Sequence, residues 1–282
     1  MTLVLLTGAT RGIGRAAAIE LASQGAEVAL VGRDPERVGE VAEQARAAGG
    51  GAPVHEHVAD LTLMAEVRAL VEEVRASYER IDVLANNAGA LFASRKETSE
   101  GLERTFALNH LAPFLLTNLL LDRLAGGRVV TTASDAHEQG QLDLTDLQSQ
   151  SSYRAMRVYG TSKLCNILFT RELAKRAPEL RANCFHPGVV RTGFGKNENG
   201  IWKILTTVAG PFLRSPERGA RSLVWLALSE QAAGLTGEYV QDEKVLAPSA
   251  QAQDEVLAEQ LWQQSARLVG LPAEAPAAKP LA

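Results

Sequence analysis

The chain has 282 residues, of which 46% are hydrophobic and 22% are charged, proportions typical of a soluble globular protein. Its net charge of −4, without any run of lysines or arginines, argues against a nucleic-acid partner. The two cysteines, Cys165 and Cys184, cannot build a disulfide framework, so both thiols are expected to be free in a reducing compartment.

The apolar run near the N-terminus, residues 3–6, is followed by a turn and is too short for a signal peptide or a membrane helix. A second apolar segment, 201–213, is interrupted by Lys203, Gly210 and Pro211 and is also too short to span a bilayer. We therefore expect a cytoplasmic protein that does not bind membranes.

Short apolar or β-branched runs alternate along the chain with longer amphipathic segments. This alternation predicts parallel strands connected by helices, that is, an α/β fold with a doubly wound sheet of about seven strands. The runs show little polar alternation, as expected for strands covered on both faces. The expected strands are 3–7, 27–32, 53–59, 81–87, 127–134, 182–188 and a short one near 238–240. The expected helices are 12–24, 35–49, 62–79, 99–125, 151–177, 216–230 and 251–268.

No internal repeat or linker divides the sequence, so we expect one catalytic domain over residues 1–270 and a flexible tail, 271–282, rich in proline and alanine. A long segment, 193–216, is rich in glycine and apolar residues, and loops of this length are usually functional. We interpret it as a lid over a hydrophobic substrate, with ordinary core or a subunit contact as the alternatives. Its apolar members include Phe194, Ile201, Trp202, Leu205, Phe212 and Leu213.

A glycine-rich turn, residues 7–15, connects the first expected strand to the first expected helix. Such a turn allows a pyrophosphate to approach the backbone, and the helix N-terminus then offers free N–H groups to the anion. Gly12, Gly14 and Ala17 also match a dinucleotide fingerprint, but that register begins five residues beyond the strand. We therefore expect Gly8 to be the turn glycine, while a tight turn without a ligand is the alternative for this motif alone.

The pattern Thr-Gly-x-x-x-Gly-x-Gly in this turn resembles the short-chain dehydrogenase/reductase family, and the resemblance continues to about residue 240. It implies a Rossmann-type fold and an oxidoreductase that binds a nicotinamide cofactor. The positions that the resemblance assigns to cofactor binding are Thr7, Gly8, Thr10, Arg11, Gly12, Ile13, Gly14, Arg33, Asp60, Leu61, Asn87, Ala88, Gly89, Tyr159, Lys163, Pro187, Gly188, Val190 and Thr192.

The end of the second expected strand indicates which nicotinamide cofactor is used. Gly32 stands where members of the family that prefer NAD tend to carry an acid, and Arg33 follows it. A second guanidinium, Arg11, lies in the glycine turn, and two guanidiniums near one ribose suit a 2′-phosphate. The alternative is a surface pair of Arg33 with Asp34, although Asp34 precedes Pro35 and is expected to open the next helix. We expect NADP(H).

Reduction of a carbonyl by a nicotinamide needs a proton donor for the developing alkoxide. Tyr159 and Lys163 are four residues apart in the expected helix 151–177, so they share one helix face, and the ammonium is expected to lower the pKa of the phenol. Alone, a tyrosine and a lysine four residues apart are common in helices and usually have no catalytic role. The position of this pair after the other motifs makes a catalytic role the favoured interpretation. The resemblance adds Ser134, which orients the substrate oxygen, and Asn109, which kinks its helix and holds a water linked to the lysine.

Ser134 and Tyr159 are 25 residues apart, about twice the separation in many members of the family. The intervening sequence, with Tyr-x-x-Ser-Lys-Leu and His-Pro-Gly-Val-Val-Arg-Thr, resembles the retinol dehydrogenase-like branch, whose members act on bulky apolar carbonyls and alcohols. The sequence shows no N-terminal hydrophobic anchor of the kind that membrane-attached members carry, which argues against a retinoid substrate.

Together these features predict an NADP(H)-dependent oxidoreductase that interconverts a ketone or aldehyde and an alcohol of a hydrophobic small molecule. By resemblance to the family, we expect a homodimer or homotetramer. One alternative is a catalytically silent nucleotide-binding regulator or scaffold, which would be expected to lose the tyrosine or the lysine. Another is a sugar-nucleotide epimerase, whose relatives usually carry a different glycine pattern and a larger C-terminal domain.

Four histidines invite other interpretations. His55 and His57 face one side of an expected strand, but no third ligand accompanies them, so we expect no metal site. His137 is expected to cap the loop after the strand that ends near residue 134, and His110 is expected to lie on a helix surface.

Overall fold

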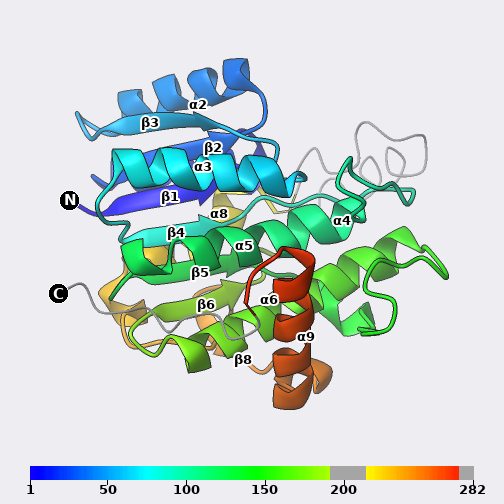
Figure 1. Ribbon diagram of the computed structural model, residues 1–282. Helices are drawn as coiled ribbons and strands as arrows, with labels where there is room; N and C mark the ends of the chain where they lie inside the picture. The colour runs from blue at the N-terminus through cyan, green and yellow to red at the C-terminus, as the bar shows by residue number, and fades with distance from the viewer. Residues whose placement is uncertain (191–213, 273–282) are drawn as a thin grey trace.

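The computed structural model describes residues 1–190 and 214–272. Within these ranges the chain forms one sheet of eight strands in the order β3-β2-β1-β4-β5-β6-β7-β8. All neighbouring strands are parallel except the last pair, β7 and β8 (Figure 1). The strands are β1 (Leu3–Thr7), β2 (Glu27–Gly32), β3 (Val54–Val58), β4 (Val83–Asn86), β5 (Arg128–Thr132), β6 (Arg181–Phe185), β7 (Tyr239–Gln241) and β8 (Lys244–Leu246).

The seven expected strands are all present, and β8 is an addition. It pairs with β7 through a two-residue turn in which Asp242 and Glu243 have φ angles of 49° and 61°. Hairpin turns with positive φ at both central residues usually contain glycine or asparagine, so this turn carried no recognisable signal. The strand itself has three exposed residues and no alternation, which is why the sequence did not reveal it.

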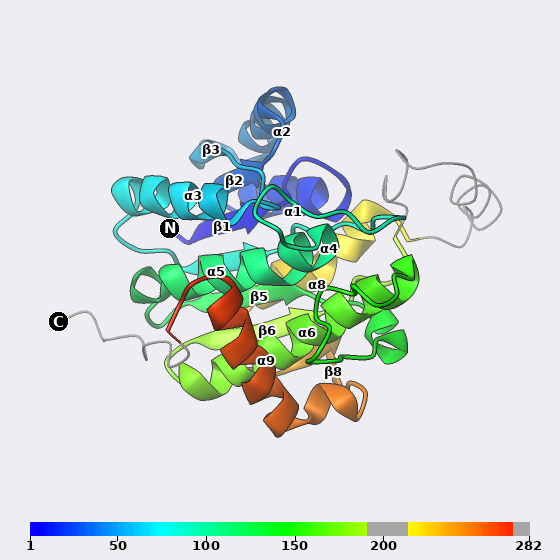
Figure 2. The same cartoon turned by 45° about the vertical axis from the view of Figure 1, so that its right-hand side comes forward.

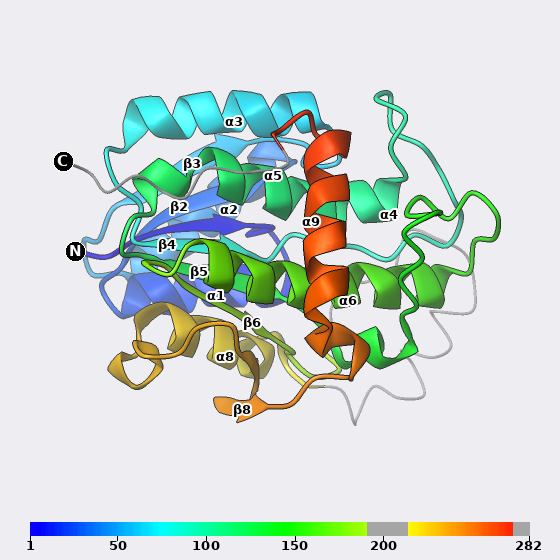
Figure 3. The same cartoon turned by 60° about the horizontal axis from the view of Figure 1, so that its bottom comes forward.

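The helices form two layers, one on each face of the sheet (Figures 1 and 2). Helices α1, α2 and α8 cover one face; α3, α5 and α6 cover the other, and α9 packs across α6 (Figure 3). The helices are α1 (Gly12–Ser23), α2 (Pro35–Ala48), α3 (Met64–Ser77), α4 (Arg104–Phe106), α5 (Ala112–Leu119), α6 (Ala155–Arg176), α8 (Pro216–Leu228) and α9 (Glu255–Leu268).

The expected helix 99–125 is interrupted. Between α4 and α5 the chain forms a π-helical turn, Ala107–Leu111, and after α5 it continues as a short 3₁₀ helix, Leu121–Arg123. A π-helical turn contains one residue more than an α-helical turn, so it redirects the side chains that follow. The expected regular periodicity therefore does not hold here.

The sheet separates two apolar cores. In β1, Leu3 and Leu5 pack against the α3, α5 and α6 side, while Val4 and Leu6 pack against the α1, α2 and α8 side. All five residues of β1 are buried, which explains the absence of polar alternation. Each fully buried leucine contributes about 1.5–3 kcal/mol, so the central strands form a rigid platform.

The carboxyl ends of β1, β4, β5 and β6 meet at one edge of this platform. The order of strands along the sheet reverses between β1 and β4, and ligands of open α/β sheets bind at such a reversal. The sequence motifs after these four strands are therefore brought to one place.

Some expectations concern residues outside the described ranges. These are Thr192, nearly all of the expected lid 193–216, and residues 273–282 of the expected tail. The described part of the lid segment is 214–216; it includes Ser215, whose hydroxyl accepts a hydrogen bond from Arg218 N at the start of α8. Among residues 1–190 and 214–272, no helix combines the length and the apolar character needed to cross a membrane.

Helix α6 packs very closely against the 3₁₀ turn that follows β5. A Cβ atom at Gly160 would lie 2.4 Å from Ala136 O, and one at Gly140 would lie 2.7 Å from Gly160 O. Only residues without side chains permit this contact between backbones.

We predict that Gly160→Ala destabilises the protein by about 1–3 kcal/mol, the usual effect of overpacking a rigid contact. Gly39→Ala is the matched control, because Gly39 also lies within a helix but its added Cβ would make only an ordinary contact, 3.6 Å from Glu56 Oε2. The control should stabilise the protein by up to about 1 kcal/mol through helix propensity. Urea unfolding measures both, and equal effects of the two substitutions would contradict the packing explanation.

Candidate active site

The glycine turn has the backbone conformation that the sequence predicts. Gly8 has a φ of 66° and Gly12 a φ of 51°, both in the left-handed region that favours glycine. A Cβ at Gly8 would lie 2.7 Å from Ala88 Cα, and one at Gly14 would lie 2.6 Å from Asn87 Nδ2. Gly8 is therefore the turn glycine, and the turn packs directly on the end of β4.

Thr7 and Asn87 tie the ends of three strands together. The Thr7 hydroxyl accepts hydrogen bonds from the N–H groups of Asn87 (3.0 Å) and Ala88 (3.1 Å). In return, Asn87 Nδ2 donates to Thr7 O (3.1 Å) and Gly8 O (3.3 Å), and Asn87 Oδ1 accepts from the Thr132 hydroxyl on β5 (3.3 Å). These bonds fix the floor of the site at the carboxyl ends of β1, β4 and β5.

The N-terminus of α1 points its free N–H groups into this region. Arg11 is the N-cap residue; its exposed side chain makes no capping bond, and the first turn holds no acidic residue. Among residues 1–190 and 214–272, no side chain accepts from these first-turn donors, which is the condition an anionic ligand requires. Farther along, Ile13 meets Val190 across Gly219 of α8, where an added Cβ would lie 3.2 Å and 2.6 Å from their respective side chains.

The end of β2 leaves no room for a side chain at Gly32. A Cβ there would lie 2.5 Å from Thr10 Cγ2 and 2.7 Å from Val38 Cγ2. The next side chain, Arg33, is 72% exposed, and its Nη1 lies 3.8 Å from Asp60 Oδ2. The guanidinium is therefore held only loosely by the protein.

Asp34 is used by helix α2, as expected. It is the N-cap residue of α2, accepts from Arg37 N, and pairs with the Arg37 side chain at 3.2 Å. The alternative surface pair of Arg33 with Asp34 is not formed. Asp60 is held in place by the N–H and hydroxyl of Thr62 (3.0 and 2.8 Å), and its neighbour Leu61 is buried.

After β6, the Pro187–Gly188 segment passes under Arg214. Gly188 has a φ of 81°, and an added Cβ would lie 2.4 Å from Arg214 Cδ. Val190 pairs with Arg214 as an isolated bridge, and the Arg214 guanidinium is held by both carboxylate oxygens of Asp242. Glycine at 188 is therefore required by both conformation and space.

Tyr159 and Lys163 lie one turn apart on α6, as predicted. Lys163 is buried and donates through Nζ to Thr132 O (2.9 Å), and Nζ lies 5.6 Å from the centroid of the Tyr159 ring. A Cβ at Gly89 would lie 3.3 Å from both Lys163 Nζ and Asn109 Oδ1. The structure thus gathers the tyrosine, the lysine and the asparagine around the end of β4.

Ser134 lies at the end of β5 next to Tyr159. Its hydroxyl caps a short 3₁₀ helix by accepting from Ala136 N (3.2 Å), donates to Asp135 Oδ1 (3.1 Å), and hydrogen-bonds the Tyr159 phenol. Its carbonyl accepts from His137 Nδ1 (2.7 Å). All four expected catalytic side chains therefore converge.

Asn109 lies in the π-helical turn, at the place where the resemblance implies a kink of its helix. Its Oδ1 accepts from Ala90 N (2.9 Å), and its Nδ2 donates to Ala90 O (3.0 Å) and Ser162 Oγ (2.9 Å). These bonds hold the segment after Gly89 against α6. The water that the family resemblance assigns to this residue stays a prediction.

Burial dominates the acid–base properties of the pair. It lowers the pKa of Lys163 to about 8, because the ammonium loses its hydration. It also raises the pKa of Tyr159 well above its ordinary value, while the hydrogen bond with Ser134 acts in the opposite direction and Asp135 adds to the rise. The expected lowering of the pKa of the phenol by the Lys163 ammonium stays a prediction for the cofactor-bound site.

Tyr153 provides an internal comparison with Tyr159. Its hydroxyl donates to Phe92 O (2.9 Å) and pairs with the Thr105 hydroxyl (3.1 Å). The residue four positions later is Arg157, not a lysine. Tyr153 thus fastens a loop.

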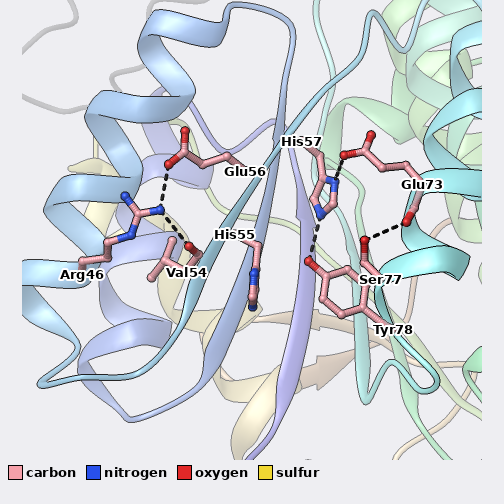
Figure 4. Close-up of a pocket in the computed structure, with 8 residues that line it drawn as sticks. All are labelled: Arg46, Val54, His55, Glu56, His57, Glu73, Ser77 and Tyr78. Carbon is pink, nitrogen blue, oxygen red and sulfur yellow. Dashed lines mark hydrogen bonds and ion pairs between the residues drawn. The ribbon is translucent and has the colours of Figure 1, made fainter.

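The two strand histidines lie far from this site, at the β3 edge of the sheet (Figure 4). His57 Nδ1 pairs with Glu73 (2.8 Å) and its Nε2 with the Tyr78 hydroxyl (2.9 Å), beside a hollow of about 430 Å³. His55 pairs with Glu27. Over residues 1–190 and 214–272, no three His, Cys, Asp or Glu side chains are arranged to hold a metal ion.

Other residues were misjudged or missed from the sequence. His110 is only 1% exposed, so its expected surface position is wrong, whereas His137 caps the loop as expected. Asp135 and His186 were not singled out: Asp135 N donates to His186 Nδ1 (3.2 Å), which links the ends of β5 and β6. The signal for them was present, since each adjoins a motif residue.

Lys163 gives the site a measurable effect on stability. Between the folded pKa of about 8 and the unfolded pKa of about 10.4, the unfolded chain binds more protons, so stability rises with pH through this window. Below pH 8 the full penalty is present, on the order of 3 kcal/mol. We predict that Lys163→Met raises the free energy of unfolding at pH 7 and removes this rise between pH 8 and 10.

Urea unfolding at pH 7 and pH 9.5 measures the effect. Lys175→Met is the control on the same helix, because Lys175 is 60% exposed and should change stability by less than about 0.5 kcal/mol. A Lys163→Met protein less stable than the wild type at pH 7 would contradict the proposed penalty.

Comparison with known proteins identifies the family. The family model described as short chain dehydrogenase matches residues 2–200. A protein from Streptomyces sp. (strain C5), provisionally named daunorubicin C-13 ketoreductase DnrU, is 46% identical over 274 residues, which cover 95% of this chain and 92% of that protein. Human retinol dehydrogenase 13 is 38% identical over 294 residues, which cover 99% of this chain and 87% of that protein.

Solved structures agree with these relatives. The crystal structure of L-sorbose reductase from Gluconobacter frateurii, complexed with NADPH and L-sorbose, is 27% identical, with a TM-score of 0.67. The match covers 88% of this chain and 97% of that one. The chain therefore belongs to the short-chain dehydrogenase/reductase family, whose members bind a nicotinamide cofactor, and to its retinol dehydrogenase-like branch.

Proposed function

We propose that the protein is an NADP(H)-dependent oxidoreductase that interconverts a ketone or aldehyde and an alcohol of a hydrophobic small molecule. The observation that carries the proposal is the convergence of Ser134, Tyr159, Lys163 and Asn109 at the carboxyl ends of β4 and β5. A silent nucleotide-binding regulator would not be expected to keep all four.

The residues around the glycine turn fit a dinucleotide. The uncapped N–H groups of α1 suit a pyrophosphate, and the backbone around Gly8, Gly14 and Gly188 lies too close to its neighbours for any side chain. Thr7, Thr10, Gly12, Ile13 and the segments after β3, β4 and β6 would complete the binding surface. When bound, the nicotinamide supplies or accepts the hydride.

Three features of the chain favour NADP over NAD. At Gly32, Thr10 and Val38 occupy the space that an acidic side chain would need. Arg33, after β2, is exposed and only loosely paired, so it is available to a 2′-phosphate, and Arg11 is exposed in the glycine turn after β1. The related L-sorbose reductase, which was solved with NADPH, supports this assignment by analogy.

In the direction of reduction, Tyr159 donates a proton to the substrate oxygen and Ser134 holds that oxygen by a hydrogen bond. The high pKa that burial gives Tyr159 keeps the phenol protonated and able to donate. The Lys163 ammonium stabilises the phenolate that remains, and Asn109 fixes the backbone beside it. In oxidation the same groups act in reverse.

The ketoreductase and retinol dehydrogenase names of the relatives support a carbonyl or alcohol on a bulky apolar skeleton. The composition of the expected lid, 193–216, supports the same substrate class. We extend the proposal to a catalytic domain over residues 1–270, a cytoplasmic location and a homodimer or homotetramer.

We predict that Tyr159→Phe lowers kcat by about 10²–10⁴-fold, the usual contribution of a general acid, while NADPH binding changes little. The rate of NADPH oxidation with a panel of aldehydes and ketones measures turnover, and fluorescence titration measures NADPH binding. Tyr153→Phe is the matched control and should retain activity, because Tyr153 fastens a loop. Wild-type turnover in Tyr159→Phe would remove this residue from the mechanism.

Arg33→Asp should weaken NADPH binding by about tenfold or more and change NADH binding little, because only NADPH carries the 2′-phosphate. Arg37→Asp, one turn further on and paired with Asp34, is the control for charge alone. Titration of each variant with NADPH and with NADH gives the two dissociation constants that test this prediction. Equal losses for NADPH and NADH in Arg33→Asp would rule out the phosphate contact.

A further inference from the structure

His110 is a buried histidine to which the proposed mechanism assigns no task. It follows Asn109 in the π-helical turn and lies among aromatic rings, stacked on Phe106 at 5.1 Å and edge-on to Phe169 at 6.3 Å. Burial lowers its pKa to about 3, so the ring is neutral at physiological pH. A polar ring in such surroundings requires hydrogen-bond partners to offset its loss of water.

One nitrogen of the ring reaches the C-terminal helix. His110 Nε2 lies 2.8 Å from the hydroxyl of Ser265, which is fully buried on α9. Helix α9 also packs across α6 (Figure 3). The C-terminal helix therefore contacts the π-helical turn through a polar bond.

The other nitrogen of the ring, Nδ1, and the Oδ1 atom of Asn166 are both buried, and neither has a hydrogen-bond partner among the described residues. The Asn166 side chain nevertheless interacts with the ring, since it opposes the effect of burial on the pKa of His110. Each atom is thus the natural partner of the other, with the neutral ring donating from Nδ1.

Asn166 in turn shares an acceptor with the catalytic lysine. Its Nδ2 donates to Thr132 O at 3.2 Å, and Lys163 Nζ donates to the same oxygen at 2.9 Å. Both side chains come from α6, three residues apart. The carbonyl at the end of β5 is therefore held from two directions.

We propose that Ser265, His110 and Asn166 form a directional hydrogen-bonded chain that positions Lys163 by fixing its acceptor, the Thr132 carbonyl. In this chain the Ser265 hydroxyl donates a hydrogen bond to His110 Nε2, His110 Nδ1 donates to Asn166 Oδ1, and Asn166 Nδ2 donates to Thr132 O. His110 and Asn166 are positioning residues, and α9 is coupled through them to the active site. The kinetic consequence rests on the proposed function, whereas the chain of bonds does not.

The opposite direction of the chain is disfavoured. If the ring carried its proton on Nε2, the lone pair on Nδ1 would require the Asn166 amide to turn round and donate to it. Asn166 Oδ1 would then face Thr132 O at the distance of a hydrogen bond, with two acceptors and no proton between them. Tautomer and amide orientation are therefore linked, and Thr132 O selects one combination.

The tautomer of His110 provides a test that needs no catalysis. In ¹⁵N NMR spectra of the full-length protein, we expect the neutral Nδ1–H form between pH 6 and 9. Asn166→Leu removes the acceptor of this proton, so the ring should change to the Nε2–H form and donate to Ser265. Ser265→Ala keeps Asn166 and should retain the Nδ1–H form. An Nε2–H ring in the wild type would overturn the chain.

The titration of Lys163, followed at its Cε carbon by NMR, tests the positioning directly. The wild-type midpoint should lie near pH 8. In Asn166→Leu it should rise by about half a unit or more, because Thr132 O then serves the ammonium alone. An unchanged midpoint would show that Asn166 does not act on Lys163.

Kinetics separate this proposal from the proposed function. His110→Phe and Asn166→Leu should lower kcat about tenfold or more with little change in the KM of the carbonyl substrate, as small misplacements of catalytic groups do. Phe114→Leu, in the same aromatic cluster, should lower thermal stability without shifting the pH profile of kcat. Wild-type kinetics and pH profile in His110→Phe would overturn the positioning role but leave the proposed function intact. An inactive wild type would overturn the proposed function. The titration of Lys163 would still decide whether the hydrogen-bonded chain positions this lysine.

Discussion

The hydrogen bond from Lys163 to the Thr132 carbonyl is the interaction on which the rest of the site depends. It fastens the middle of α6 to the end of β5, so Tyr159, one turn earlier, is held beside Ser134. The same carbonyl lies at the edge where Thr7 and Asn87 join the ends of β1 and β4. A single backbone oxygen thus connects Tyr159, the proposed proton donor, to the floor of the proposed cofactor site.

This arrangement opposes the ordinary preferences of a folded chain. An ammonium is buried, a phenol is desolvated, and backbones approach so closely that only glycine fits at Gly8, Gly14 and Gly160. The stability lost in this way is offset by the two apolar cores, in which helices cover both faces of the sheet. Stability and chemistry are therefore assigned to different parts of the molecule, the core and the strand ends.

The order of motifs along the chain was sufficient to predict the sheet, the turn at Gly8 and the convergence of Tyr159 with Ser134. Parallel strands place their carboxyl ends together whatever the packing between them, so these features follow from local patterns. The inward position of His110 did not, because a π-helical turn shifts the helix face that follows it. Strand β8 was also missed, because it depends on a turn without glycine. Each miss concerns a property that only surrounding residues decide.

The packing at the end of β2 restricts how cofactor preference can change. Because Thr10 and Val38 fill the space above Gly32, an acid introduced at this position alone would displace the glycine turn before it met any ribose. A smaller residue at 10 or 38 must come first, and by itself it brings no benefit. If the chain uses NADP as proposed, conversion to NAD use through an acid at position 32 passes through an intermediate without advantage, and the order of the substitutions decides whether this route is open.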